Sequence, residues 1–242
     1  MRYSDLAALV VHVRPYRETS AMVQFFTREH GRLVGVMKGL HRGRRQQLVQ
    51  PFQAGRLSCA GKSGLVTVTQ FDTSERFMLE ADGLSAGFYV LELLTRCLAE
   101  HQAEPRVFDA TLAVLAALTQ NAALAPTLRR FEQTLLHELG YGYDLRHALD
   151  SDQTGHMAVA PDAHYRLVDE VGFVRTLSTP GSASKAGLDV IPGWVLLALA
   201  DRDYSGAQVL YTAKLLNQHA LKPLLGPAPL ISRTMYTGTP RG

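Results

Sequence analysis

Cations interleaved with aromatic side chains are the clearest chemical feature in the first third of this 242-residue sequence. Tyr16, Phe25 and Phe26 lie among a series of basic residues: Arg14, Arg17, Arg28, Arg32, Lys38, Arg42, Arg44, Arg45 and Lys62. Binding of single-stranded nucleic acid needs this mixture, because cations follow the phosphates while aromatic rings stack on bases of any identity. The alternative for the aromatic rings is a core position, and alternation along a strand places at least one of the two phenylalanines there.

The basic residues are densest in VMKGLHRGRRQQLVQPF, residues 36–52, where four cations fall within eight residues between two extended apolar segments. The charge of the whole chain is also uneven. Residues 1–80 hold 12 Lys or Arg and 6 Asp or Glu, whereas residues 81–242 hold 13 and 16. Basic charge concentrated in one domain is typical of a protein that binds a polyanion, and a solvated charged face is the alternative. The imbalance predicts two domains with different partners.

Motifs for enzymatic chemistry are weak. AGKSG, residues 60–64, lacks the glycine at position 56 that a phosphate-binding loop requires, and it precedes a strand pattern, so a hairpin turn is the better interpretation. The nine histidines show no recognised metal-ligand spacing. A hydrolase or nuclease would need clustered carboxylates or an activated nucleophile, and neither pattern is present. We predict a protein that is not an enzyme and needs no metal or other cofactor.

The composition predicts a soluble protein in the cytoplasm. Hydrophobic residues make up 46% and charged residues 19% of the chain, as in ordinary folded proteins. Two cysteines are too few for a disulfide framework and indicate a reduced compartment. The first residues lack a secretory cleavage signature, and no segment is apolar over the roughly 20 residues that a membrane span needs.

The cations of the first third must be positioned by strands. Apolar residues alternate or cluster in five segments, 6–13, 21–27, 32–39, 48–60 and 64–72, and glycines and a proline separate them. Five short strands predict a small closed barrel, in which Gly35 fits a bend or bulge in the third strand. The basic stretch is then a loop between the third and fourth strands, and AGKSG is the turn before the fifth.

Helical periodicity begins near residue 83. Five helices are expected, at 84–101, 105–120, 126–140, 189–203 and 206–222; Pro105 suits a first turn and Gly140 a C-cap. A polar insertion at about 147–185 interrupts them and contains one hairpin, 164–176. The expected fold is therefore α+β, with an N-terminal five-stranded OB-fold barrel over residues 1–80 and a mainly helical domain with a small β-hairpin insertion over residues 81–242.

Several stretches resemble the RecO family of bacterial recombination mediators. They occur in the family's order: VVHVRPYRETSAMVQFFTREHGRLVGVMKG (10–39), LVQPF (48–52), LRRFEQTLLHELGYGYDL (128–145), HYRLVDEVGFV (164–174) and ALKPLLGPAPLISR (220–233). The resemblance implies an OB-fold barrel that binds single- and double-stranded DNA, followed by a helical domain. It also implies annealing of complementary strands in DNA repair and, with RecR, loading of RecA onto strands coated by single-stranded-DNA-binding protein.

The resemblance extends to a partner site and a metal site. The family's helical domain binds the acidic C-terminal tail of single-stranded-DNA-binding protein, which makes Arg129 and Arg130 the candidate contacts. The alternative is that one arginine pairs with a carboxylate such as Glu132 or Glu138, and we expect one functional and one structural arginine. Some members hold zinc through four cysteines in the insertion, but this chain has no cysteine after Cys97, which makes it a zinc-less variant.

A second function remains open from the residues alone. Barrels of this type also bind RNA, and no residue here recognisably contacts a 2′-hydroxyl group, so an RNA-binding barrel with a helical partner domain is the alternative. The resemblance favours DNA and a location at the nucleoid in the cytoplasm.

Overall fold

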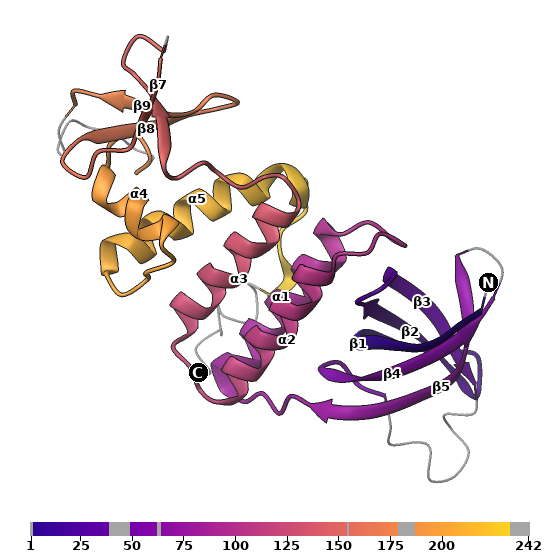
Figure 1. The fold of residues 1–242 in the computed structure, drawn as a ribbon. Helices are drawn as coiled ribbons and strands as arrows, with labels where there is room; N and C mark the ends of the chain where they lie inside the picture. Colours follow the sequence, from indigo (N-terminus) through magenta and orange to yellow (C-terminus); the bar gives the residue numbers. More distant parts are fainter. Residues whose placement is uncertain (1, 39–48, 62–63, 154, 179–186, 233–242) are drawn as a thin grey trace. The chain divides into compact units, whose positions relative to one another are not determined.

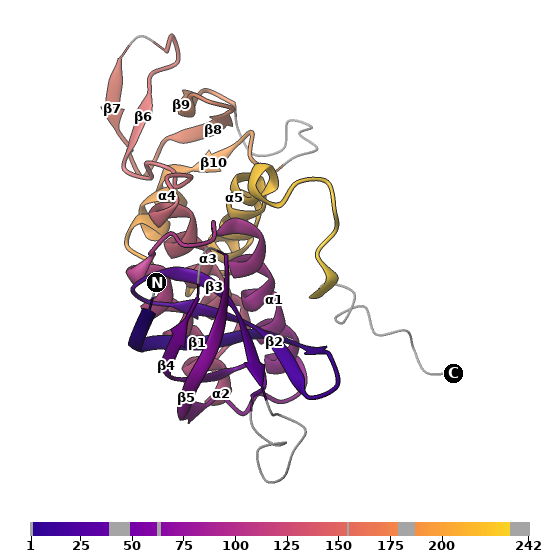
Figure 2. The ribbon, with the colours of Figure 1, turned by 90° about the vertical axis from the view of Figure 1, so that its right-hand side faces the viewer.

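The computed structural model describes residues 2–38, 49–61, 64–153, 155–178 and 187–232. The chain divides into two compact units: unit 1 contains Met1–Leu124 and Leu225–Gly242, and unit 2 contains Ala125–Leu224. Along the sequence, unit 2 is thus inserted into unit 1. Figures 1 and 2 show the elements, and each unit is described by itself. The domain boundary expected at residue 80 stays a prediction.

Five strands of unit 1 form a closed barrel (Figure 1): β1 (Arg2–Tyr16), β2 (Ser20–Thr27), β3 (Gly31–Lys38), β4 (Gln53–Ala60) and β5 (Leu65–Arg76). Their order is β1-β2-β3-β5-β4, and β4 pairs with β1 to close the barrel. The β3–β5 pair is parallel and the other pairs are antiparallel. The predicted barrel of an OB-fold followed by helices is confirmed.

Side-chain alternation explains the barrel core. Ala21, Val23 and Phe25 of β2 point inward with Leu33 of β3, and all four are buried. The β2–β3 register continues unbroken past Gly35, so of the two predicted alternatives the bulge is wrong and the bend stays a prediction; the register shifts lie in β1 and between β4 and β5. A Cβ atom at Gly35 would lie only 2.7 Å from the Val68 side chain in β5. Glycine there permits the close parallel approach that joins β3 to β5.

Two helices complete the main body of unit 1: α1 (Ala81–Cys97) and α2 (Pro105–Thr119). Pro105 occupies the first turn of α2, as predicted. Phe52 of the barrel contacts Phe88 of α1 with ring centroids 4.9 Å apart, and Phe26 contacts Phe108 of α2 at 5.5 Å. These aromatic contacts fix the barrel to the two helices.

The turn between β2 and β3 also contacts the segment between α1 and α2 through the backbone. The His101 N–H donates to the Arg32 carbonyl at 3.1 Å, and Arg32 pairs with Glu100 as an isolated bridge. Gly31 has φ +66°, and a Cβ atom there would lie 1.9 Å from the carbonyl oxygen of Gln102. Only glycine permits both this backbone conformation and this contact.

Unit 2 combines three helices with a small sheet. The helices are α3 (Leu124–Glu138), α4 (Gly193–Ala200) and α5 (Ala207–Leu225). The strands β6 (His147–Leu149), β7 (His156–Ala158), β8 (His164–Val168), β9 (Gly172–Thr176) and β10 (Ile191–Pro192) follow the order β10-β8-β9-β6-β7. The predicted hairpin is β8–β9, and it belongs to a larger sheet than expected. Tyr165, Phe173 and Ile191 bring this sheet into one core with α4 and α5.

The end of α3 confirms the predicted C-cap. Gly140 has φ +79°, its N–H donates to the His137 carbonyl at 3.1 Å, and the Tyr141 N–H donates to the Leu136 carbonyl at 2.8 Å. This pair of hydrogen bonds is the Schellman motif, which satisfies carbonyls that the last helical turn leaves free.

Candidate nucleic-acid interface

Strand register brings three of the predicted cations to one end of the barrel. Tyr16, Ser20 and Lys38 face one another across β1, β2 and β3, and the next row consists of Arg14, Met22 and Val36. Paired residues share a face of the sheet, and this face is the outer one, because Ala21 and Val23 point into the core. Arg17 follows in the short β1–β2 turn. We call Arg14, Tyr16, Arg17 and Lys38 the basic end.

The three cations of the basic end are exposed, and Tyr16 is partly exposed. The Arg17 guanidinium lies 5.2 Å from the centre of the Tyr16 ring, and the Arg14 guanidinium contacts the Met22 sulfur. The exposed carboxylate Glu18 shares the turn with Arg17. Lys38 is also the first cation of the basic stretch of the sequence. Chemically, the basic end offers separate positive charges and one aromatic face, as a nucleic-acid backbone with stackable bases requires.

Arg28 lies at the opposite end of β2, beside α2. Its Nε and Nη2 atoms donate to the two carboxylate oxygens of Asp109 at 2.9 and 3.0 Å. This ion pair and its hydrogen bonds raise the pKa of Arg28 and lower the pKa of Asp109. Arg28 therefore has an internal partner that any phosphate would have to replace.

Arg32 is only partly exposed, on the face covered by the helices. Burial lowers the pKa of its guanidinium, an effect that the nearby Glu100 opposes. Its Nε atom is buried and has no hydrogen-bond partner within the described ranges. Of the other predicted contacts, Arg42, Arg44, Arg45 and Lys62 lie outside the described residues.

The aromatic part of the prediction needs a correction. Phe25 and Phe26 are both fully buried, Phe25 inside the barrel beside Phe71 and Phe26 outside it beneath Phe108. Neither ring is available to a base, because α2 covers the outer face where Phe26 lies. Tyr16 is the aromatic residue left at the basic end.

Several other surface features of the barrel were not predicted from the sequence. Arg2, Arg56 and Arg76 are exposed on β1, β4 and β5, and Arg56 lies 3.8 Å from the Asp5 carboxylate. Partly buried Met22 and Val34 lie on the outer face of β2 and β3. Met22 and Val34 could have been found in the sequence, because each is an apolar residue at a strand position whose side chain points out of the barrel.

The two arginines of α3 have different environments within unit 2. Arg129 Nη2 donates to Glu132 Oε1 at 2.6 Å, and the two side chains are only 12% and 1% exposed. Asn217 Nδ2 donates to the other carboxylate oxygen of Glu132 at 2.9 Å. The prediction that one arginine pairs with a nearby carboxylate is confirmed. Arg129 is thereby held in a buried network.

Arg130 is exposed, and its guanidinium lies 5.6 Å from the centre of the Tyr204 ring. Burial raises the pKa of Tyr204 to about 12, and its hydroxyl donates to Gln133. Tyr204 and Gln133 line a pocket of about 250 Å³ together with apolar side chains: Leu136, Leu145, Leu199 and Leu216. An exposed cation therefore lies near a small pocket of mixed lining, in which the polar side chains include His137, Arg202 and Asn217.

Two histidines in unit 2, His147 and His219, pair with neighbouring side chains. His147 Nδ1 lies 3.0 Å from Asp144, and His219 bridges the Tyr143 hydroxyl at 2.8 Å and Asp169 at 3.1 Å. Among the described residues, no group of three or more His, Cys, Asp or Glu side chains is arranged to hold a metal ion. No described helix is long and apolar enough to cross a membrane.

A closed five-stranded barrel with a cationic end, followed by helices, defines the oligonucleotide-binding class of barrel protein. Family models identify the member of that class: "Recombination protein O N terminal" matches residues 1–77, and "Recombination protein O C terminal" matches residues 78–166. The chain belongs to the RecO family, whose role is in DNA repair and recombination.

Relatives support the same assignment over nearly the whole chain. It is 39% identical to a DNA repair protein RecO from Stutzerimonas stutzeri, covering 95% of this chain and 92% of the relative. It is 38% identical to one from Haemophilus influenzae, covering 94% and 93%, and 36% identical to one from Cellvibrio japonicus, covering 99% and 100%.

Proposed function

We propose that the chain is a recombination mediator whose barrel, within residues 1–80, binds single- and double-stranded DNA through the basic end and the adjoining basic stretch. The observation that carries the proposal is the register of β1, β2 and β3, which places Arg14 and Lys38 on one face with Tyr16. Arg42, Arg44, Arg45 and Lys62 extend the same charge in the sequence. The mediator works without a cofactor or a catalytic step, in the cytoplasm at the nucleoid.

Strand annealing follows from charge neutralisation. Two complementary strands repel each other through their phosphates, and cations bound along one strand reduce that repulsion and release counterions. Base pairing then supplies the free energy, so the protein has only to hold the strands close together. Tyr16, with one aromatic face, holds bases without selecting their identity.

The helical domain, within residues 81–242, recruits the protein partners. Arg130 and the pocket beside Tyr204 suit an acidic peptide that ends in an apolar residue, which is the chemistry of the tail of single-stranded-DNA-binding protein. Arg129 supports the helix that carries Arg130. Together with RecR, this contact lets the chain act on coated strands and helps to load RecA.

The DNA-binding proposal is tested with two triple variants that remove equal charge. Arg14→Ala, Arg17→Ala and Lys38→Ala together are expected to weaken binding of a labelled single strand and to reduce the salt slope by about one for each phosphate that the variant no longer binds. Arg2→Ala, Arg56→Ala and Arg76→Ala together are the control. Equal losses of affinity in both variants would show that DNA binding depends on the net charge of the protein. The basic end would then not be a specific DNA-binding site.

Annealing of coated strands tests whether the barrel binds DNA while the helical domain binds the protein partner. Complementary strands, naked or coated with single-stranded-DNA-binding protein, are mixed with the chain. Arg130→Ala is expected to slow annealing of coated strands and to leave naked strands unaffected, whereas the basic-end variant slows both. Equal rates for Arg130→Ala and the unchanged protein on coated strands would refute the partner assignment.

A further inference from the structure

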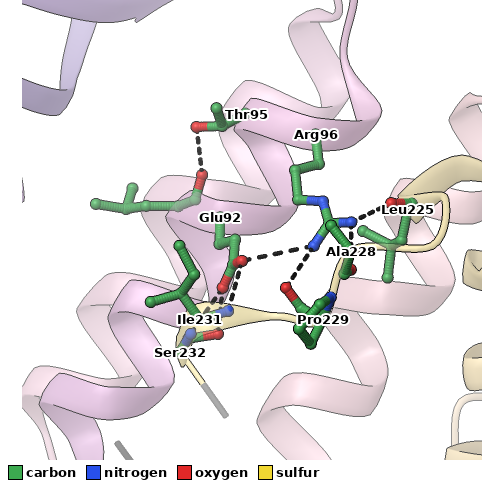
Figure 3. A network of polar contacts seen from close by, with 9 residues as sticks. Glu92, Thr95, Arg96, Leu225, Ala228, Pro229, Ile231 and Ser232 are labelled. Atoms are coloured by element: carbon green, nitrogen blue, oxygen red, sulfur yellow. Dashed lines mark hydrogen bonds and ion pairs between the residues drawn. The ribbon is translucent and has the colours of Figure 1, made fainter. Parts of the chain in front are cut away.

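Two side chains of α1 hold the last described segment of unit 1. Figure 3 shows Glu92 and Arg96, one helical turn apart, facing Leu225–Ser232. Arg96 Nη2 donates to the carbonyls of Leu225 and, at 2.7 Å, Ala228; Nη1 donates to that of Pro229 at 3.1 Å. We call Glu92 and Arg96 the α1 clamp and Gly226–Ser232 the returning segment.

Glu92 binds the other end of the returning segment. Its Oε1 accepts the Ile231 N–H at 2.8 Å, and its Oε2 accepts the Ser232 N–H at 2.9 Å and the Ser232 hydroxyl at 2.6 Å. The Arg96 guanidinium lies 3.7 Å from the Glu92 carboxylate, and the two side chains are only 19% and 15% exposed. Arg96 thus supplies hydrogen-bond donors and the adjacent Glu92 supplies acceptors along the same segment.

Recognition by the α1 clamp is almost entirely through main-chain atoms. Five of the six hydrogen bonds to Leu225–Ser232 involve a backbone carbonyl or N–H, and only the Ser232 hydroxyl is a side-chain group. Leu230 and Ser232 are buried, at 5% and 3% exposure, whereas Gly226–Pro229 are exposed and Ile231 is 69% exposed. Main-chain contacts with a few buried side chains are the usual basis of peptide recognition.

We propose that the α1 clamp is a peptide-docking site whose present occupant is the chain's own returning segment, and that a partner segment that turns into a helix, as this one does at Ile231 and Ser232, can replace it. The partner segment has an aliphatic residue two positions before a hydroxyl residue, as Leu230 precedes Ser232. This inference does not depend on the proposed DNA or tail contacts, because it concerns a different surface.

A partner segment has to compete with the chain's own returning segment for the α1 clamp. The returning segment belongs to the same chain as the α1 clamp, so the folded chain between them fixes the effective concentration at which the segment competes with a partner. The returning segment begins at Gly226, with φ +61° directly after α5, a backbone conformation favourable to glycine. A partner replaces the segment when its own affinity and concentration exceed this cis competition.

The test uses the full chain and a fluorescent peptide that corresponds to Leu225–Ser232. Leu230→Asp releases the returning segment, because it places a charge in a buried position. The peptide is expected to bind this variant at least about tenfold more tightly than the unchanged chain, and adding Arg96→Ala is expected to remove that gain. Equal binding to the unchanged chain and a folded Leu230→Asp variant would overturn the proposal.

Two further measurements complete the test. Peptides changed at the exposed positions of Ala228 and Ile231 are expected to keep their affinity, whereas loss of binding would show that only the chain's own sequence fits. If Leu230→Asp fails to fold, hydrogen exchange of the Ile231 and Ser232 amides is followed in the unchanged chain. Excess peptide is expected to speed their exchange; unchanged rates, or concentration-dependent dimers of the chain in place of peptide binding, would overturn the partner assignment.

Discussion

At the scale of single residues, the availability of an arginine depends on the carboxylate beside it. Arg28 and Arg14 look equivalent in the sequence, but Arg28 pairs with Asp109, which is 81 residues away. Arg129 and Arg130 are adjacent, yet only Arg129 has a buried network, completed by Asn217. Sequence spacing left Glu132 and Glu138 as local candidates, of which Glu132 is the partner, whereas it could not identify Asp109 or Asn217, because those contacts require the folded chain.

The buried network around Glu132 predicts a large loss of stability. Glu132→Ala leaves the Arg129 guanidinium buried without its carboxylate, and breaking a buried ion pair in this way costs about 3–5 kcal/mol. The free energy of unfolding is measured by urea denaturation. Arg130→Ala is the control, because loss of its exposed side chain should change the free energy of unfolding by about 0.5 kcal/mol or less. Similar losses for both variants would show that the buried pair contributes no more to stability than the exposed arginine.

Arg130 also predicts an effect on binding of the partner. Arg130→Ala is expected to weaken binding of an acidic tail peptide by about tenfold, because a charge-assisted hydrogen bond contributes about 1.5 kcal/mol. The dissociation constant is measured by fluorescence anisotropy with a folded variant. The assignment is refuted if Arg130→Ala binds normally. A lysine substitution at residue 130 is a useful control, because it restores charge without the planar guanidinium.

Glu92 predicts a pH dependence of stability. Burial raises the pKa of this carboxyl, but hydrogen bonds from Ser232 and Ile231 and the Arg96 charge together hold it below its ordinary value of 4.5. Since the pKa is lower in the folded state, Glu92 stabilises the fold above pH 4.5 and loses this effect as the pH falls through its folded pKa. Glu92→Gln is expected to flatten the pH dependence of the unfolding free energy in that acidic range, as measured by urea denaturation at a series of pH values.

At the scale of elements, periodicity predicted most of the fold. Alternating apolar residues identified all five barrel strands and the β8–β9 hairpin, and Pro105 and Gly140 marked helix ends. The residues of these strands and helix ends contact neighbours that are one strand or one helical turn away. The local sequence pattern was therefore sufficient to predict these elements. The register shifts in β1 lie in its pairings with β2 and β4, and the role of Gly35 depends on the β3–β5 pairing between distant segments. Alternation showed that one phenylalanine was buried, but burial of Phe26 required α2.

The β2–β3 turn predicts an element-scale effect at Gly31. Gly31→Ala both strains a left-handed backbone and places a methyl group against the Gln102 carbonyl. Gly140→Ala has a similar φ of +79° with open space around it, so it should cost only about 1–2 kcal/mol. Gly31→Ala is expected to lower the free energy of unfolding by clearly more. Equal losses in chemical denaturation would show that the contact with Gln102 relaxes without cost.

At the scale of the whole molecule, charge and resemblance indicated the family, but the arrangement of the chain could not be predicted. The basic first third and the helical remainder were evident from composition and periodicity. That Leu225–Ser232 returns to unit 1 depends on hydrogen bonds to Glu92 and Arg96, more than 125 residues earlier in the chain. The local pattern of a short apolar segment cannot show which distant helix the segment contacts.

The insertion of unit 2 within unit 1 has a consequence for synthesis. A ribosome delivers Met1–Leu124 first, then all of Ala125–Leu224, and only then the residues that Glu92 and Arg96 bind. Domains commonly fold as they emerge. Unit 2 is therefore synthesised in full before α1 meets its partner segment, and unit 1, which begins first, is the last to be completed.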